Sequence, residues 1–234
     1  MALDASFQNL LASLAAANLA PGSTALIPKD FTPSVHLNLT YGHQKVSLGN
    51  VLRTSETTTA PIVTFDSEVY CCVVVWLCGP PHPPRPSPKP PSQSQHQNEC
   101  KSDSSLTRLH MSVRKKADGT SYTLLLVDPD APTPEDPKFA YWRHWIVTGL
   151  TGSTSQDAAL AATAYLGPGP KDATASPHRY LFLLFREPAG FKFARGEVGG
   201  DAFVERRSFD AAGWAAGRGL VLVGVEWFSG VGDL

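Results

Sequence analysis

Two carboxylates and two imidazoles stand at the ends of strand-like segments, where a fold could bring them to one site. Asp128 and Asp130 directly follow the apolar run 122–127, in a loop that contains prolines. His144 opens a second run of β-forming residues, and His178 opens a third. Because imidazole groups can donate hydrogen bonds to a phosphate or a carboxylate group, this pattern is typical of an anion-binding pocket.

Residues 178–180 have the sequence His-Arg-Tyr and add a phenol to the same set. In an extended segment, side chains two positions apart share a face, so His178 and Tyr180 point to one side and Arg179 to the other. The preceding turn 167–170, Gly-Pro-Gly-Pro, could bring rigid backbone close to a ligand. Each histidine taken alone could equally be a buried structural residue, and the Asp-Pro and Gly-Pro pairs could be ordinary turns.

A strand followed by Asp-x-Asp also occurs in phosphotransferases that use a nucleophilic aspartate with magnesium. Here Pro132 stands two residues after Asp130, and no companion lysine motif is apparent. The G-x-x-x-x-G-K, G-x-G-x-x-G, G-x-S-x-G and H-E-x-x-H motifs of other enzyme classes are absent from the sequence. A metal-dependent phosphotransferase or phosphatase using Asp128 and Asp130 is therefore the alternative to a binding protein without a cofactor.

Composition places the chain among ordinary globular proteins. It has 234 residues, with 20 basic and 21 acidic side chains and a formal charge of -1, so no strong positive field favours nucleic acid. No apolar segment reaches the roughly twenty residues of a membrane helix, and no basic region precedes Asp4, which predicts a cytoplasmic protein without a transmembrane segment. The four cysteines lack paired zinc-ligand spacing. They are Cys71, Cys72, Cys78 and Cys100.

Hydrophobic periodicity predicts a β-rich α+β domain with few helices. Apolar residues at helical spacing over 7–14 predict a short helix with a cap at Asp4. Period-two alternation over 35–41, with a turn at Gly42, predicts a hairpin. Further strands are expected at 62–65, 122–127, 144–148, 178–185 and 220–227, and helical composition recurs at 156–165 and 209–216.

Residues 69–111 differ in composition from both neighbouring parts. They include eight prolines between Pro80 and Pro91 and a Ser/Gln/His/Asn-rich tract, a composition that predicts mostly disordered chain. We interpret the segment as a lineage-specific loop or a translated intron, inserted into a single domain. The expected parts of that domain are an N-terminal helix at 1–22, a first part at 23–68, the insertion at 69–111 and a second part at 112–234.

With these motifs in order, the chain resembles the phosphatidylethanolamine-binding protein family, especially its fungal, carboxypeptidase Y inhibitor-like members. The resemblance is carried by Asp128-Pro-Asp-Ala-Pro132, Asp136-Pro-Lys-Phe139, Trp142-Arg-His-Trp145, Gly167-Pro-Gly-Pro170 and His178-Arg-Tyr180. It covers approximately residues 27–65 and 114–227, and leaves the insertion outside.

The resemblance implies an antiparallel β-sandwich with a small pocket for phosphate-like or phospholipid head groups. It also implies a non-enzymatic regulatory protein that inhibits a serine carboxypeptidase or modulates kinase signalling. By matched position, the implied lining residues are Asp128, Pro132, His144, Pro170, His178 and Tyr180, and the implied supporting residues are Asp130, Trp142 and Phe139. Phe139 replaces a tyrosine of many relatives, which removes one hydroxyl donor from the implied site.

Overall fold

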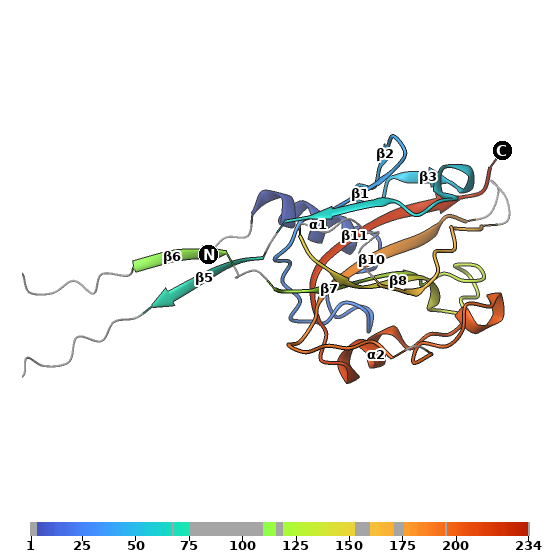
Figure 1. The fold of residues 1–234 in the computed structure, drawn as a ribbon. Coiled ribbons are helices and arrows are strands. Elements are labelled where there is room, and N and C mark those ends of the chain that lie inside the picture. Colours follow the sequence, from blue (N-terminus) through green and yellow to red (C-terminus); the bar gives the residue numbers. More distant parts are fainter. Residues whose placement is uncertain are drawn as a thin grey trace, which may run out of the picture. The chain divides into compact units, whose positions relative to one another are not determined.

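The structure is a computed structural model that describes residues 4–66, 68–74, 110–115, 119–152, 160–170, 176–194 and 196–233. The chain divides into two compact units, one of residues 1–69 and 116–234 and one of residues 70–115. The ends of the segment expected to be an insertion form the paired strands β5 (Val69–Val74) and β6 (His110–Lys115) (Figure 1). Residues 75–109 lie outside the described residues, so the insertion and the division of the domain stay predictions.

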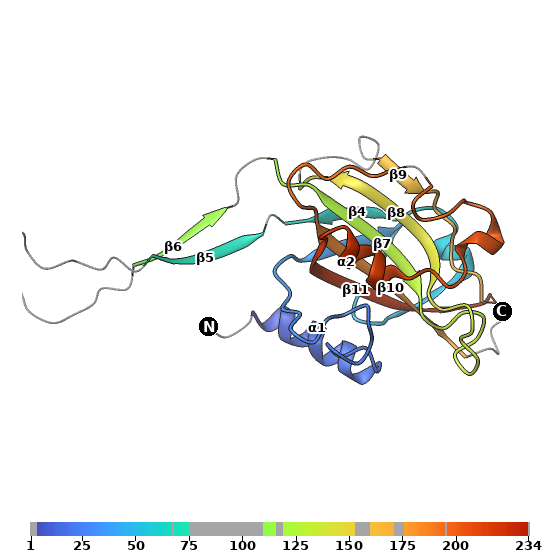
Figure 2. The same ribbon diagram turned by 90° about the horizontal axis from the view of Figure 1, so that it is seen from below.

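The larger unit is mostly β-structure and contains two sheets (Figures 1 and 2). The six-stranded sheet has the order β3 (Val51–Arg53), β11 (Val221–Val231), β10 (His178–Arg186), β7 (Tyr122–Asp128), β8 (Trp142–Leu150), β9 (Leu160–Thr163). The three-stranded sheet has the order β2 (Gln44–Lys45), β1 (Leu37–Tyr41), β4 (Ile62–Phe65). β3 runs parallel to β11, so the larger sheet is mixed and not purely antiparallel as expected.

The strands lie where side-chain alternation and apolar runs predicted them. In β1, residues 37, 39 and 41 are buried and the residues between them are half-buried, which is the period-two pattern of a strand with one buried face. Gly42, with φ of 54°, turns β1 into β2 and confirms the expected hairpin. β7 is buried at every position because its side chains pack in apolar clusters on both faces of the sheet.

Two apolar clusters form the core, one on each face of the large sheet. Along β10, Leu181 and Leu183 pack in the cluster that includes the helices, whereas Tyr180 and Phe182 pack in the cluster shared with the three-stranded sheet. This alternation sets the face on which each neighbouring side chain of β10 emerges. His178, two residues before Tyr180, therefore lies on the Tyr180 face at the end of the strand.

The described part of the unit also contains two α-helices and two short 3₁₀ helices: α1 (Ala5–Ala16), α2 (Ala211–Gly217), η1 (Thr54–Thr57) and η3 (Phe203–Arg206). The Asp4 side chain accepts a hydrogen bond from the Ser6 backbone N–H at 2.8 Å and caps α1 as predicted. Within the described residues, no helix is long and apolar enough to cross a membrane.

The helix predicted at 156–165 is wrong over its described part. Residues Leu160–Thr163 form β9, which pairs antiparallel with β8 at the edge of the sheet. The alanine-rich sequence favours a helix locally, but pairing with an edge strand overrides that weak preference. Residues 153–159 lie outside the described residues.

Candidate functional site

A cavity of about 590 Å³ lies where β7, β8 and β10 begin or end. It brings together all of the predicted lining residues except Pro170, which is buried and does not line it. Residues 167–169 of the same turn form the wall in its place. The lining residues are Asp128, Ala131, Pro132, Phe139, Trp142, His144, Leu166, Gly167, Pro168, Gly169, His178, Tyr180, Phe203 and Arg207.

Asp128 and His178 form a buried pair in the cavity wall. Nδ1 of His178 lies 2.8 Å from Oδ2 of Asp128, and the backbone N–H of Asp130 donates to Oδ1 of Asp128 at 2.6 Å. Burial alone would lower the pKa of His178, but its hydrogen bond to Asp128 and the charge of that carboxylate raise the pKa above its ordinary value. Asp128 therefore favours the imidazolium form of His178.

His144 has the opposite tendency, because it is deeper in the protein. Its Nδ1 lies 2.7 Å from the carbonyl oxygen of Leu166, so Nδ1 is the donor and the neutral ring carries its lone pair on Nε2. Burial lowers the pKa of His144, and the charge of Asp128 opposes that shift only in part. The ring packs edge-on against Tyr180, with centroids 5.2 Å apart. Burial therefore favours the neutral imidazole form of His144.

Asp130 supports the wall from behind and does not line the cavity. One oxygen of its carboxylate accepts hydrogen bonds from the backbone N–H and from Nε of Arg179, at 2.7 and 2.9 Å. Nη2 of Arg179 donates to the other oxygen, and Nη1 donates to the carbonyl oxygen of Ala17 at 2.7 Å, just after α1. The expected opposite orientations of residues 178 and 179 are thus present, and each side chain pairs with a different aspartate.

Arg207 is a cavity residue that the sequence did not suggest, because it stands in a Glu-Arg-Arg run typical of an exposed surface. Its guanidinium lies 4.2 Å from the ring centre of Phe139, 5.8 Å from Trp142 and 5.7 Å from Phe203. Among the described residues, no carboxylate lies within ion-pair distance of it. The positive charge of Arg207 is therefore not neutralised by that part of the chain.

Two buried N–H groups of the cavity wall have no hydrogen-bond partner within the described ranges. They are Nε of Arg207 and the indole Nε1 of Trp142. A buried donor without an acceptor costs about 1 to 3 kcal/mol. Both atoms are closed to solvent, although they belong to residues that line the cavity.

Tyr180 is the most tightly enclosed member of the site. Its ring is stacked on Phe228 with centroids 5.1 Å apart and lies 6.2 Å from the ring of His178. Gly230, opposite His178 on β11, lies directly against this ring. A Cβ at Gly230 would lie 2.3 Å from Cε2 of Tyr180, closer than any real carbon contact.

We therefore expect Gly230→Ala to lower the free energy of unfolding by about 2 kcal/mol, as overpacked cores do. Urea unfolding followed by tryptophan fluorescence measures this change. Gly217→Ala is the matched control, because a Cβ at Gly217 meets nothing within 4 Å and alanine is favourable in α2, so this variant should not lower the midpoint. Equal destabilisation by the two variants would contradict the close approach of Gly230 to Tyr180.

Comparison with known proteins gives the family. A family model described as phosphatidylethanolamine-binding protein matches residues 88–222, which is more than half of the chain. The chain belongs to the phosphatidylethanolamine-binding protein family. The matched range includes every residue that lines the cavity, and it begins inside the segment 69–111 that was expected to lie outside the resemblance.

Individual relatives of this phosphatidylethanolamine-binding protein family member are distant or match only in part. Protein MOTHER of FT and TFL1 homolog 2 of Oryza sativa subsp. japonica is 40% identical over 70 residues, which is 30% of this chain and 38% of that protein. Carboxypeptidase Y inhibitor, solved in complex with its cognate proteinase, is 20% identical with a TM-score of 0.64 over 99% of this chain and 98% of that one. The phosphatidylethanolamine-binding protein of Plasmodium vivax is 16% identical with a TM-score of 0.61, over 95% of this chain and 97% of that one. The two solved structures share the fold of this chain.

Proposed function

We propose that this member of the family binds a phosphate-like anion in the cavity and acts as a regulatory binding protein, without catalysis. The observation that carries the proposal is the Arg207 guanidinium, which belongs to the cavity lining and which no described carboxylate neutralises. His178 and Tyr180 add donors to the same lining. A phosphoryl group accepts several hydrogen bonds at once and matches this set.

The arrangement of the aspartates argues for binding and not for phosphoryl transfer. A nucleophilic aspartate needs a free oxygen facing the substrate, and a magnesium site needs oxygens that converge on one point. Asp130 faces Arg179, and both oxygens of Asp128 already accept hydrogen bonds. In the part of the chain that the structure describes, no group of three or more His, Cys, Asp or Glu side chains could hold a metal ion.

The test is an NMR titration of the protein with O-phosphoethanolamine and, separately, with vesicles of phosphatidylethanolamine in phosphatidylcholine. Shifts of the His144 and His178 ring signals with the free head group would support the anion site. Response to the vesicles as well would identify the lipid as a source of that group, and response to the free compound alone would exclude membrane-bound head groups. Imidazole signals that do not move with either probe would overturn the proposal.

The regulatory role that we propose is inhibition of a serine carboxypeptidase. It is supported by the similarity in fold to carboxypeptidase Y inhibitor, which was solved with its cognate proteinase. Peptidase activity should fall in proportion to added protein and vanish near equimolar concentration. Undiminished activity across a titration would exclude this role and leave the anion site standing. Modulation of a kinase pathway stays a prediction from the sequence.

The neutral state of His144 gives binding a defined pH dependence. An anion near this ring favours the imidazolium, so binding raises the pKa of His144 from its lowered value and takes up a proton. Affinity for sulfate, which keeps a constant charge between about pH 8 and about pH 6, should therefore rise severalfold as the pH falls. The charge of Asp128 opposes the lowered pKa of His144, whereas Arg206 and His178 lower it further.

Calorimetry in two buffers with different ionisation enthalpies measures this proton uptake directly. His144→Asn keeps a donor for the Leu166 carbonyl but cannot titrate, so proton uptake should largely disappear in this variant. The same uptake in the variant and in the unmodified protein would assign the proton to another group.

A further inference from the structure

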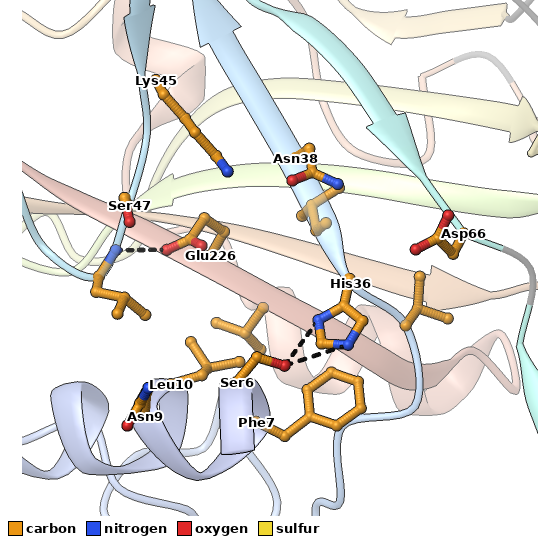
Figure 3. A pocket seen from close by; sticks show the side chains of 14 residues that line it. Ser6, Phe7, Asn9, Leu10, His36, Asn38, Lys45, Ser47, Asp66 and Glu226 are labelled. Atoms are coloured by element: carbon orange, nitrogen blue, oxygen red, sulfur yellow. Dashed lines mark hydrogen bonds between the residues drawn. The ribbon is translucent and has the colours of Figure 1, made fainter. Parts of the chain in front are cut away.

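A second cavity, of about 450 Å³, lies between α1, the start of β1, the β2–β3 region and β11 (Figure 3). It shares no lining residue with the first cavity, which we call the anion cavity after the function proposed for it. Its volume is in the range of sites that hold small organic molecules, roughly 300 to 1,000 Å³. The lining residues are Ser6, Phe7, Asn9, Leu10, Val35, His36, Leu37, Asn38, Lys45, Ser47, Leu48, Asp66, Val225 and Glu226.

The apolar part of this second cavity is firmly held. Leu10, Leu37 and Val225 are buried core residues, and each presents one surface to the cavity. The ring of Phe7 is stacked on the ring of His36, with centroids 4.0 Å apart and planes inclined by 10°. This pair forms a flat aromatic wall above an aliphatic floor, a shape that suits a planar or aliphatic group of a ligand.

Glu226 is the most strongly positioned polar group of the second cavity. Its Oε1 accepts hydrogen bonds from the backbone N–H of Leu48 at 2.9 Å and from that of Trp227 at 3.0 Å. Its Oε2 makes no hydrogen bond with the described residues. Two backbone donors on one oxygen fix the carboxylate and leave the second oxygen available to a ligand in the cavity.

The charges around Glu226 are unbalanced. The lining contains two carboxylates, Glu226 and Asp66, and one ammonium group, Lys45. In Figure 3 the two carboxylates stand at opposite sides of the cavity. Within the described ranges, neither Asp66 nor Lys45 forms an ion pair, so the negative excess is not cancelled by contacts. A cavity with an apolar floor and a net negative charge favours an amphipathic cation.

We propose that this second cavity binds a small amphipathic amine, with the ammonium group on Oε2 of Glu226 and the apolar body against Phe7 and Leu10. An ammonium group donates up to three hydrogen bonds and supplies the positive counter-charge for the Glu226 carboxylate. The stacked aromatic wall and aliphatic floor bury the apolar body of the molecule. The proposal concerns a site separate from the anion cavity and does not depend on the function proposed there.

The test uses three probes of similar shape: phenethylamine, 2-phenylethanol and 3-phenylpropionate. They are titrated into the ¹⁵N-labelled full chain, with the backbone amides of Leu48 and Trp227 as reporters because both donate to Glu226. Saturable shifts of these amides with phenethylamine, and weaker ones with the neutral alcohol, are expected. Stronger binding of the carboxylate probe, or amine-induced shifts only around the anion cavity, would overturn the proposal.

Two charge variants give effects of opposite sign. Glu226→Gln keeps the acceptor for both backbone donors but removes the charge, and it should weaken phenethylamine binding about tenfold or more. Lys45→Met removes the opposing charge, and it should strengthen binding about two- to threefold at low salt, less at high salt. The surface variant Asp136→Asn is the matched control and should leave the affinity unchanged. Weakening by both cavity variants would indicate a general disturbance and would contradict the charge-based site.

Discussion

Asp130→Asn should lower the free energy of unfolding by about 3 kcal/mol, although it exchanges only one oxygen for an NH₂ group. Asp130 is 2% exposed and accepts hydrogen bonds from the backbone, Nε and Nη2 of Arg179. An asparagine turns one acceptor into a donor that faces another donor and leaves the guanidinium without its counter-charge. Removing one partner of a buried ion pair costs about 3 to 5 kcal/mol, and we expect the lower end because the Arg179 side chain is 30% exposed.

Chemical denaturation at constant pH measures this loss for Asp130→Asn. The matched control is Asp136→Asn, because the pair that Asp136 forms with Lys138 has the same chemistry at 65% and 59% side-chain exposure. An exposed pair contributes about 0 to 1 kcal/mol, so the control should be close to the unmodified protein. Equal stabilities of the two variants would mean that the Arg179 pair does not hold the loop.

Arg207→Gln should reduce sulfate affinity by about ten- to a hundredfold, the range expected for loss of a charge-assisted hydrogen bond. The reason is that Arg207 brings to the cavity a positive charge that no described carboxylate neutralises. The variant loses the contacts of the guanidinium with three aromatic rings but should stay folded, since each such contact contributes only about 0.5 to 1 kcal/mol. Isothermal titration calorimetry with sulfate, together with the thermal midpoint, separates the two effects.

Lys192→Gln provides the control for Arg207→Gln. Lys192 is exposed and away from the cavity lining, so the variant changes the net charge by the same amount without changing the site. Its sulfate affinity should be nearly unchanged. If both variants lose affinity equally, the anion responds to the total charge of the protein and not to Arg207.

The strands could be predicted because their signal is local. Alternation in residues 37–41 and the uninterrupted apolar run at 122–127 each follow from the burial of one or both faces of a strand. The parallel pairing of β3 with β11 joins residues about 180 positions apart, and no local pattern reveals it. The alanine-rich segment at 160–163 shows the same limit, because its conformation is set by the neighbouring strand β8.

The same difference between local patterns and long-range contacts applies to the residues of the candidate site. Asp128, His144 and His178 were found because each stands at the end of a predicted strand, where side chains from adjacent strands meet. Arg207 follows a 3₁₀ helix in the long connection from β10 to β11, and only the folded path of that connection brings it to the aromatic rings. Pro170 was expected in the lining, whereas residues 167–169 line the cavity, since a motif identifies a turn but not which of its residues faces a cavity.

The bond from Arg179 to the carbonyl oxygen of Ala17 couples the amino-terminal helix to the loop behind the anion cavity. A truncated chain that lacks this helix loses any contact that the helix makes with a partner. It also loses the acceptor for Nη1 of Arg179, the side chain that pairs with Asp130. If such a deletion reduces inhibition or anion affinity, the reduction therefore has two causes, the missing contact surface and the loosened pocket. Arg179→Lys in the intact chain keeps the helix but weakens both the bond to Ala17 and the pair with Asp130, so its effect measures the loosened pocket without the missing contact surface.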